Sequence, residues 1–458
     1  MHARLELPEL VQGLLVAGAT GLAIVPLYVA YFGMTFEIAV ALCIIQGFII
    51  ALSPIAFGDP FCAGWLTPAL PLVLRQATSM AEVSDRIDFV TALVLSVAVV
   101  FLFFGLTGLG PLFLRRVPRA LQAGIILGAG MSAIYGEFTP SGADNLSRLD
   151  RYPVCIMLAV GVTLLLLFSL PVERLKRRFR SLAALAALGI APGFVVAMIV
   201  GPWVGEVDYS SVQALFVDPE SGAWIFGLGD VFFWPQFGAL LEGYSPLSRG
   251  FPSLDTFILA LPLTLVAYVI GFGDLVTGSA ILKEAQKFRP DEKIPLDDRR
   301  THLSLGLRNA LQALLTGPFF PLHGPLWTGS MVVVAERFRR GRKQMDSIFG
   351  GIFSYYAFGI PILLFCRPVI ELLRPVLNIA FSLTLLLTGF ACAYVALAMV
   401  KERTERGVVV LVGMLIMYPP FFRESQFSIG LGLLAGLAIT IALLGRDAFR
   451  REEAESPR

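Results

Sequence analysis

Three ionisable side chains lie inside long apolar stretches of the sequence, where a charge is costly and function is a common reason for keeping one. Asp274 stands near Gly273 and Thr277 in such a stretch, so its carboxyl group could take up and release a proton during a cycle. Arg308 is a partner for Asp274, a contact for an anion, or a cation that reaches back to the membrane surface. His323 can titrate near neutral pH, although a lone histidine is often only hydrogen-bonded in place. Asp274 and His323 are therefore candidates for proton coupling.

Two segments combine tryptophan, threonine, glycine and proline in the same order. DPFCAGWLTPALP at 59–71 and PFFPLHGPLWTGS at 318–330 each run through glycine to tryptophan, then threonine, then proline or glycine. Proline removes a donor and clashes inside a helix, so neither segment is predicted to be a continuous helix. Each break would expose the first N–H groups of a short helix, which favour an anionic or acceptor-rich ligand. The candidate substrate-binding residues are Gly64, Trp65, Thr67, Asp274, Thr277, His323, Trp327, Thr328 and Gly329.

Two of these residue types have common structural roles as well. Trp65 and Trp327 could sandwich a flat ligand, but tryptophans of membrane proteins usually anchor at the lipid–water interface. Gln46 is a weaker candidate for a site. Gly124 and Gly128, four residues apart, indicate close contact between helices.

Transmembrane helices are the elements that would position these residues. Of the 458 residues, 56% are hydrophobic and 15% are charged, whereas soluble domains are about 25% charged. A hydrocarbon core about 30 Å thick needs about 20 apolar residues in a helix. Long apolar stretches lie near 11–32, 37–56, 89–110, 119–136, 153–171, 181–201, 255–280, 347–366, 376–400, 407–421 and 427–445. With three shorter, interrupted stretches at 61–74, 303–317 and 319–335, the sequence predicts fourteen transmembrane segments.

The distribution of Lys and Arg agrees with this count. With a cytoplasmic N-terminus and fourteen crossings, the inside segments hold 27 basic residues and the outside segments 8. Cytoplasmic loops are enriched in Lys and Arg, and one miscounted span would exchange the sides of every later loop. We therefore expect a multi-pass protein of the cell (inner) membrane with both termini cytoplasmic.

The chain divides into two similar halves. Residues 1–201 form a first repeat of seven spans, 202–254 an external acidic loop, 255–445 a second repeat, and 446–458 a cytoplasmic tail. An odd number of spans turns the second repeat upside down, as in many secondary transporters. The expected fold is therefore all-α and integral to the membrane, with two inverted repeats of seven and discontinuous third and tenth segments. Unwound backbone at membrane depth occurs where it is buried in protein or lines a wet cavity.

Several segments also resemble a known family. They are LSLGL at 303–307, ALLTG at 313–317, 321–329, YVIGFGD at 268–274, and in the first half 117–130 and 188–201. These segments resemble the nucleobase–ascorbate transporter (xanthine/uracil permease) family and, more distantly, its sulfate-permease relatives. The resemblance implies fourteen spans, a core and a gate domain, and often a homodimer. Where the family has substrate-binding acids, this chain has Ile270 and, near Leu326, no carboxylate, so a nucleobase substrate is not implied.

Other functional classes find little support. The chain has no nucleotide-binding loop, hydrolase elbow or cluster of metal ligands, and only three histidines, so no enzyme, cofactor or metal site is predicted. The basic run at 337–343 fits an orientation signal or an anionic-lipid contact better than a nucleic-acid site. A membrane-embedded enzyme and a sensor or scaffold are the less favoured alternatives.

The prediction is a secondary active transporter that moves a small anionic or acidic heterocyclic solute by alternating access. A nucleobase-like compound, an oxyanion and a carboxylate are all within this class. Its coupling ion would be a proton or sodium. The alternative is an anion exchanger or channel-like permease of the sulfate-permease type.

Overall fold

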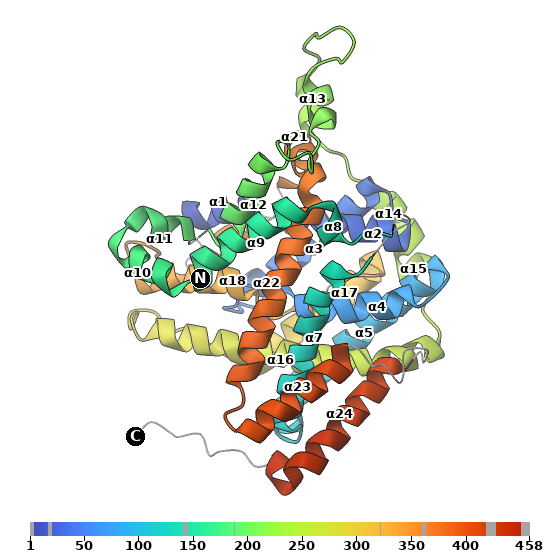
Figure 1. The fold of residues 1–458 in the computed structure, drawn as a ribbon, viewed down its shortest axis with the longest axis vertical. Helices are drawn as coiled ribbons and strands as arrows, with labels where there is room; N and C mark the ends of the chain where they lie inside the picture. Colours follow the sequence, from blue (N-terminus) through green and yellow to red (C-terminus); the bar gives the residue numbers. More distant parts are fainter. Residues whose placement is uncertain are drawn as a thin grey trace.

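The computed structural model describes residues 4–16, 21–140, 145–186, 188–320, 322–359, 363–417 and 427–449. Almost all regular structure in these residues is helical (Figure 1). The two strands found there have two residues each and pair with one another.

The elements up to residue 200 are mostly helices separated by short turns. They are α1 (Leu7–Val16), α2 (Val25–Phe32), α3 (Phe36–Ala56), β1 (Gly64–Trp65), the 3₁₀ helix η2 (Thr67–Ala69), α4 (Leu70–Thr78), α5 (Val83–Thr107), α6 (Gly110–Arg115), α7 (Arg119–Phe138), α8 (Arg148–Arg151), α9 (Pro153–Phe168), α10 (Leu170–Arg178), α11 (Arg180–Ala186) and α12 (Ala191–Val200).

The later elements follow the same pattern after an irregular connection. That connection holds α13 (Ser210–Phe216), η3 (Leu228–Val231), α14 (Phe237–Tyr244) and α15 (Pro246–Arg249). Then come α16 (Leu254–Gln286), α17 (Asp298–Thr316), β2 (His323–Gly324), α18 (Thr328–Arg339), α19 (Ile348–Phe353), the π-helical turn η4 (Ser354–Gly359), α21 (Arg367–Leu373), η5 (Arg374–Val376), α22 (Leu377–Ala398), α23 (Arg403–Met417), α24 (Ser428–Leu444) and η6 (Gly445–Phe449).

Several helices have the length and composition of membrane spans. In the described part of the chain, four qualify: Phe36–Ala56, Val83–Thr107, Leu254–Gln286 and Arg367–Ala398. A fifth is added if Pro153–Phe168 and Leu170–Lys176, which meet at a bend of 62°, form one span. Ala191–Val200 and Ser428–Leu444 are shorter apolar helices. These helices support a multi-pass membrane protein, and the number fourteen stays a prediction.

The helices pack in two groups. In the first group, α5 packs on α16 and α17, and α17 packs on α3. In the second, α7 packs on α22 and α23, α23 on α24, and α9 on α12 and α22. Each group takes helices from both halves of the chain, so the halves interleave (Figure 1).

Glycines allow close approach inside each group. A Cβ on Gly306 of α17 would lie 2.6 Å from Leu102 of α5, and one on Gly105 of α5 would lie 2.9 Å from Leu303 of α17. In the second group, a Cβ on Gly128 of α7 would lie 2.7 Å from Ile416 of α23. Real Cβ atoms do not approach so closely, so these helix contacts depend on glycine.

The part of the connection that holds α13 projects from one end of the molecule, whereas α14 and α15 pack on α3 and α17 (Figure 1). The connection exposes Trp203, Trp224 and Trp234 at 88%, 68% and 78% of their surface. The two remaining tryptophans of the chain are Trp65 and Trp327, so only these two lie outside this region.

Candidate functional site

The two proline- and glycine-rich segments meet in space. β1 and β2 pair in antiparallel register, Gly64 opposite Gly324 and Trp65 opposite His323. The pairing continues at both ends, because the Leu66 amide donates to the Leu322 carbonyl at 2.6 Å and the Trp327 amide to the Cys62 carbonyl at 2.5 Å. Backbone that is not helical thus finds its hydrogen-bond partners in the opposite segment, as buried backbone must.

Glycine is required at the centre of this crossing. A Cβ on Gly64 would lie 2.7 Å from the Cβ of Trp327, and one on Gly324 would lie 3.2 Å from the backbone of Trp65 and Leu66. Both segments therefore carry glycine where two main chains pass closest to one another.

A helix begins directly after each strand. After β1, η2 starts at Thr67 and continues into α4, while after β2, α18 starts at Thr328. The N-cap residues are Leu66 and Trp327, and neither side chain caps its helix. The first N–H groups of a helix have no partner within it, so the start of α18 brings free donors and a positive dipole end to the crossing. The start of η2 offers fewer, because Pro68 has no N–H group and the Ala69 amide donates to the Leu66 carbonyl.

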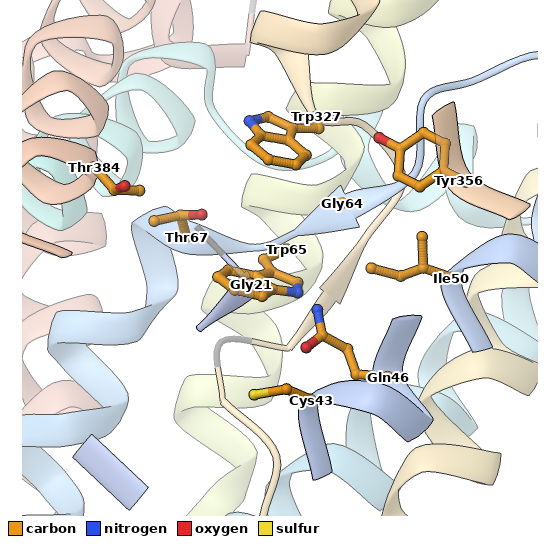
Figure 2. A pocket seen from close by; sticks show the side chains of 10 residues that line it. All are labelled: Gly21, Cys43, Gln46, Ile50, Gly64, Trp65, Thr67, Trp327, Tyr356 and Thr384. Carbon is orange, nitrogen blue, oxygen red and sulfur yellow. The ribbon is translucent and has the colours of Figure 1, made fainter. Parts of the chain in front are cut away.

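A pocket opens beside the crossing. Its water-accessible volume is about 40 Å³, room for a few water molecules or one small ion. Figure 2 shows Trp327 and Trp65 on either side of β1, with the Gln46 amide directed toward Trp65. The lining residues are Gly21, Cys43, Gln46, Ile50, Gly64, Trp65, Thr67, Trp327, Tyr356 and Thr384.

The lining is mostly apolar and carries a few uncharged polar groups, and it comes from both helix groups. Gln46 of α3 is 4% exposed, and its Oε1 atom has no hydrogen-bond partner in the described part of the chain. Two lining hydroxyl groups belong to Thr67, which follows β1, and to Thr384 on α22. Because α3 belongs to the first group and α22 to the second, relative motion of the groups would change the pocket.

Four of the predicted substrate-binding residues line this pocket: Gly64, Trp65, Thr67 and Trp327. Thr328 and Gly329 begin α18, but their side chains lie outside the described residues. Their placement as ligand contacts stays a prediction.

The two predicted residues of α16 do not line the pocket. The Thr277 hydroxyl donates to the carbonyl of Gly273 at 2.9 Å, one turn back along α16. Asp274 is half-buried, and Cys392 on α22 is a titratable neighbour of its carboxyl group. Asp274 therefore faces the second helix group rather than the crossing.

His323 lies at the crossing, although its side chain is not part of the pocket lining. The ring is fully buried, with its centre 4.6 Å from that of Phe319 and its Nε2 atom 3.4 Å from Oε1 of Gln312. Asn309 of α17 holds the backbone of His323 on both sides: the His323 amide donates to Oδ1 at 3.1 Å, and Nδ2 donates to the carbonyl at 3.2 Å. α17 thus positions β2.

Arg308 also binds β2 from α17. Its side chain is 1% exposed, and its Nη2 group donates to the Gly324 carbonyl at 2.9 Å. Asp59 and Tyr356 are its titratable neighbours, and Asp274 is not among them. The Asp59 carboxylate, 1% exposed, accepts a hydrogen bond from the Thr301 hydroxyl at 2.9 Å.

Sequence inspection missed half of the pocket. Five lining residues carried no signal of their own in the sequence: Gly21, Cys43, Ile50, Tyr356 and Thr384. Only Gln46 stood out, because an amide within an apolar stretch has few structural reasons to be there.

Comparison with known proteins gives the fold. No protein-family model matches the chain, and no curated protein matches its sequence. Among solved structures, the transmembrane domain of a cyanobacterium bicarbonate transporter, BicA, is similar over 96% of this chain and 98% of that one, with a TM-score of 0.51 and 15% identity. The chain has the fold of a transporter's membrane domain.

A second solved structure is similar over a comparable length. Murine Solute Carrier 26 family member A9, an anion transporter in the inward-facing state, matches 97% of this chain and 69% of that one, with a TM-score of 0.49 and 12% identity. The fourteen spans and the core and gate domains that the family resemblance implies stay predictions. Membership of the nucleobase–ascorbate family stays a prediction.

Proposed function

We propose that this protein is a secondary active transporter that carries a small anion across the cell membrane by alternating access. The observation that carries the proposal is the pocket at the β1–β2 crossing. Two tryptophans and the Gln46 amide line it, the uncapped start of α18 follows Trp327, and no charged side chain is among its described lining residues. Free N–H groups at helix starts are a common way of binding anions.

Among the predicted solutes, the size and chemistry of the pocket favour a small oxyanion or carboxylate over a heterocycle. A volume of about 40 Å³ accommodates a small oxyanion or short carboxylate more readily than a heterocycle. A nucleobase would also need a fixed pattern of donors and acceptors, and Gln46 alone offers a side-chain amide. We therefore propose an oxyanion or small carboxylate as substrate. The bicarbonate and anion transporters with similar folds fit this class.

The first helix group would be the core domain and the second the gate. If residues 1–201 and 255–445 are inverted repeats, α7, α9 and α12 correspond to α22, α23 and α24. Under this pairing, the contact of α7 with α23 corresponds to the contact of α22 with α9. The contact of α7 with α24 likewise corresponds to the contact of α22 with α12. This correspondence supports the seven-plus-seven plan, in which one domain rocks against the other around the site.

Coupling to a proton or sodium ion is assigned to Asp274. The electrostatic interaction of Asp274 on α16 with Cys392 on α22 supports a role at the boundary between the proposed core and gate. A group there can bind a cation in one arrangement of the domains and release it in the other. The ring of His323 is buried against Gln312 and does not line the pocket. It would therefore hold β2 in position rather than touch the solute.

Uptake into proteoliposomes tests the proposal with radiolabelled sulfate, bicarbonate and uracil. We expect saturable uptake of at least one anion, reduced about tenfold or more by Trp65→Leu or Trp327→Leu. Trp203→Leu is the matched control, because Trp203 is 88% exposed and far along the chain from the crossing. Failure to take up any anion, or an equal effect of the control, contradicts the proposal. Gradient-driven uptake that survives Asp274→Asn contradicts the role of Asp274.

The second candidate is an anion exchanger or channel-like permease. The neutral lining favours it, because coupling to a proton at the pocket itself would need a titratable carboxyl group. Uptake that depends on an anion inside the vesicle and ignores imposed pH and sodium gradients would select the exchanger. Anion currents under voltage would select the channel.

A further inference from the structure

Among the described residues, two arginines are buried almost completely, and they differ in how their donors are used. Arg289 is 2% exposed and makes five hydrogen bonds with Asp291 and with the carbonyls of Phe338, Met345 and Asp346. Arg308 is 1% exposed and makes one, to the Gly324 carbonyl. Its Nε and Nη1 atoms have no partner in the described part of the chain.

This contrast separates a structural cation from one with another role. A buried guanidinium whose donors all bind nearby oxygens stabilises the segments that carry those oxygens, as Arg289 does. A buried guanidinium with unused donors is costly, because its desolvation is not repaid by hydrogen bonds. Folding stability therefore does not explain why Arg308 is charged.

The location of Arg308 suggests what its charge acts on. Gly324, which it holds, pairs across the crossing with Gly64, and Gly64 lines the pocket. Tyr356, another lining residue, is a titratable neighbour of the guanidinium. The positive charge therefore lies one strand behind the pocket, out of contact with a bound solute.

Asp59 interacts electrostatically with Arg308 and offsets part of this field, but no ion pair joins the two side chains in the described part of the chain. Asp59 is buried, but its Oδ1 atom accepts from the hydroxyl of Thr301, and the unpartnered Arg308 donors are not bound to it. A charge left without a contact partner in a low-dielectric interior acts over a longer range than a surface charge.

We propose that Arg308 determines the charge selectivity of the site, acting through its electric field across the β1–β2 pair. The inference rests on the proposed anion site and adds the residue that favours anions there. The pocket lining itself carries no charge among the described residues, so the start of α18 and Arg308 together would supply the positive potential.

The expected size of the effect follows from the geometry. One hydrogen bond and one strand spacing put the guanidinium roughly 8 Å from the pocket. A unit charge at this distance, with an effective dielectric constant of about 20, changes the affinity for a monovalent anion by about 30-fold. For a divalent anion the free-energy change doubles, so the affinity ratio of two anions of equal shape and different charge changes by a further factor of about 30.

Sulfate and perchlorate are such a pair, because both are tetrahedral oxyanions that carry two and one negative charges. Their binding can be followed by tryptophan fluorescence of the purified protein. Replacing Trp203, Trp224 and Trp234 by Phe leaves Trp65 and Trp327, which both line the pocket, as the only tryptophans. In this background we expect Arg308→Gln to weaken perchlorate binding about 30-fold and to lower the sulfate-to-perchlorate affinity ratio by about 30-fold.

Two further variants separate the field from a structural effect. Arg308→Lys keeps the charge without the planar fork and should restore most of the ratio. Arg289→Gln removes an equally buried arginine outside the site, so it should lower thermal stability and leave the ratio unchanged. An Arg308→Gln protein that binds both anions less tightly by the same factor, or a lysine variant that restores nothing, overturns the inference. A parent protein that binds neither anion overturns the proposed anion site itself.

Discussion

At the scale of single residues, the pocket is notable for a polar group without a partner. Gln46 is buried in α3, and its Oε1 atom finds no donor in the described part of the chain. An unsatisfied buried oxygen costs free energy, and a water molecule in the pocket can donate to it, whereas a bound anion would accept from the Nε2 group of Gln46. Gln46 is therefore expected to contribute to binding at the expense of stability.

Gln46→Met tests this balance, because methionine has a similar length and no polar atom. We expect solute affinity to fall roughly tenfold, from loss of about one hydrogen bond, while thermal stability stays equal or rises by up to about 1 kcal/mol. Thermal unfolding with and without the transported anion measures both quantities. A variant that is destabilised and binds normally would show that Gln46 has only a structural role.

At the scale of elements, the crossing of β1 and β2 is the feature on which the site depends. Four backbone groups of residues far apart in the chain satisfy one another there, and Asn309 of α17 fixes β2 from behind. The helix starts after both strands take their position from this pairing. A change that separates the strands should therefore affect the pocket from both sides at once.

Gly64→Ala introduces a Cβ that would lie 2.7 Å from the Cβ of Trp327. We expect a loss of about 1–3 kcal/mol in stability from overpacking, together with loss of anion binding because Trp327 must shift. Gly161→Ala in α9 is the control, since a Cβ there meets nothing within 4 Å. Thermal unfolding and fluorescence titration report the two effects. Normal binding by the Gly64 variant would mean that the pocket does not depend on this close approach.

At the scale of the whole molecule, function depends on which loops face which side. The 27-to-8 division of Lys and Arg predicts that the 337–343 run is cytoplasmic and that the acidic 202–254 connection is external. The structure puts Glu220 and Lys343 on the surface of these two regions. Four of the native cysteines are buried and Cys366 is half-buried, so an added thiol would report with little background.

Single cysteines therefore test the orientation. In intact cells, a membrane-impermeant maleimide should label Glu220→Cys and should label Lys343→Cys only after the membrane is opened. Labelling of both variants in intact cells, or the reverse pattern, would contradict the predicted arrangement of spans between residues 220 and 343. The two variants serve as each other's control.

The sequence by itself determined the properties that are written locally along the chain. Hydropathy identified a membrane protein, and the proline and glycine of 59–71 and 318–330 identified segments that cannot be continuous helices. Trp65 and Trp327 were found because they follow those interruptions, and both line the pocket. Such features arise from the transfer of side chains to lipid and from backbone sterics, which depend on the residues themselves.

Only the tertiary structure decided which of the polar residues meet. Asp274 was the clearest candidate by sequence, yet it faces α22, whereas the weaker candidate Gln46 and the unforeseen Thr384 line the pocket. The hydrogen bonding of Arg308 could not be predicted either. Its Nη2 group donates to the Gly324 carbonyl in β2, and its Nε and Nη1 groups have no acceptor within the described residues. Helix packing brings these positions together, and the depth, rotation and crossing of helices depend on contacts between residues hundreds of positions apart.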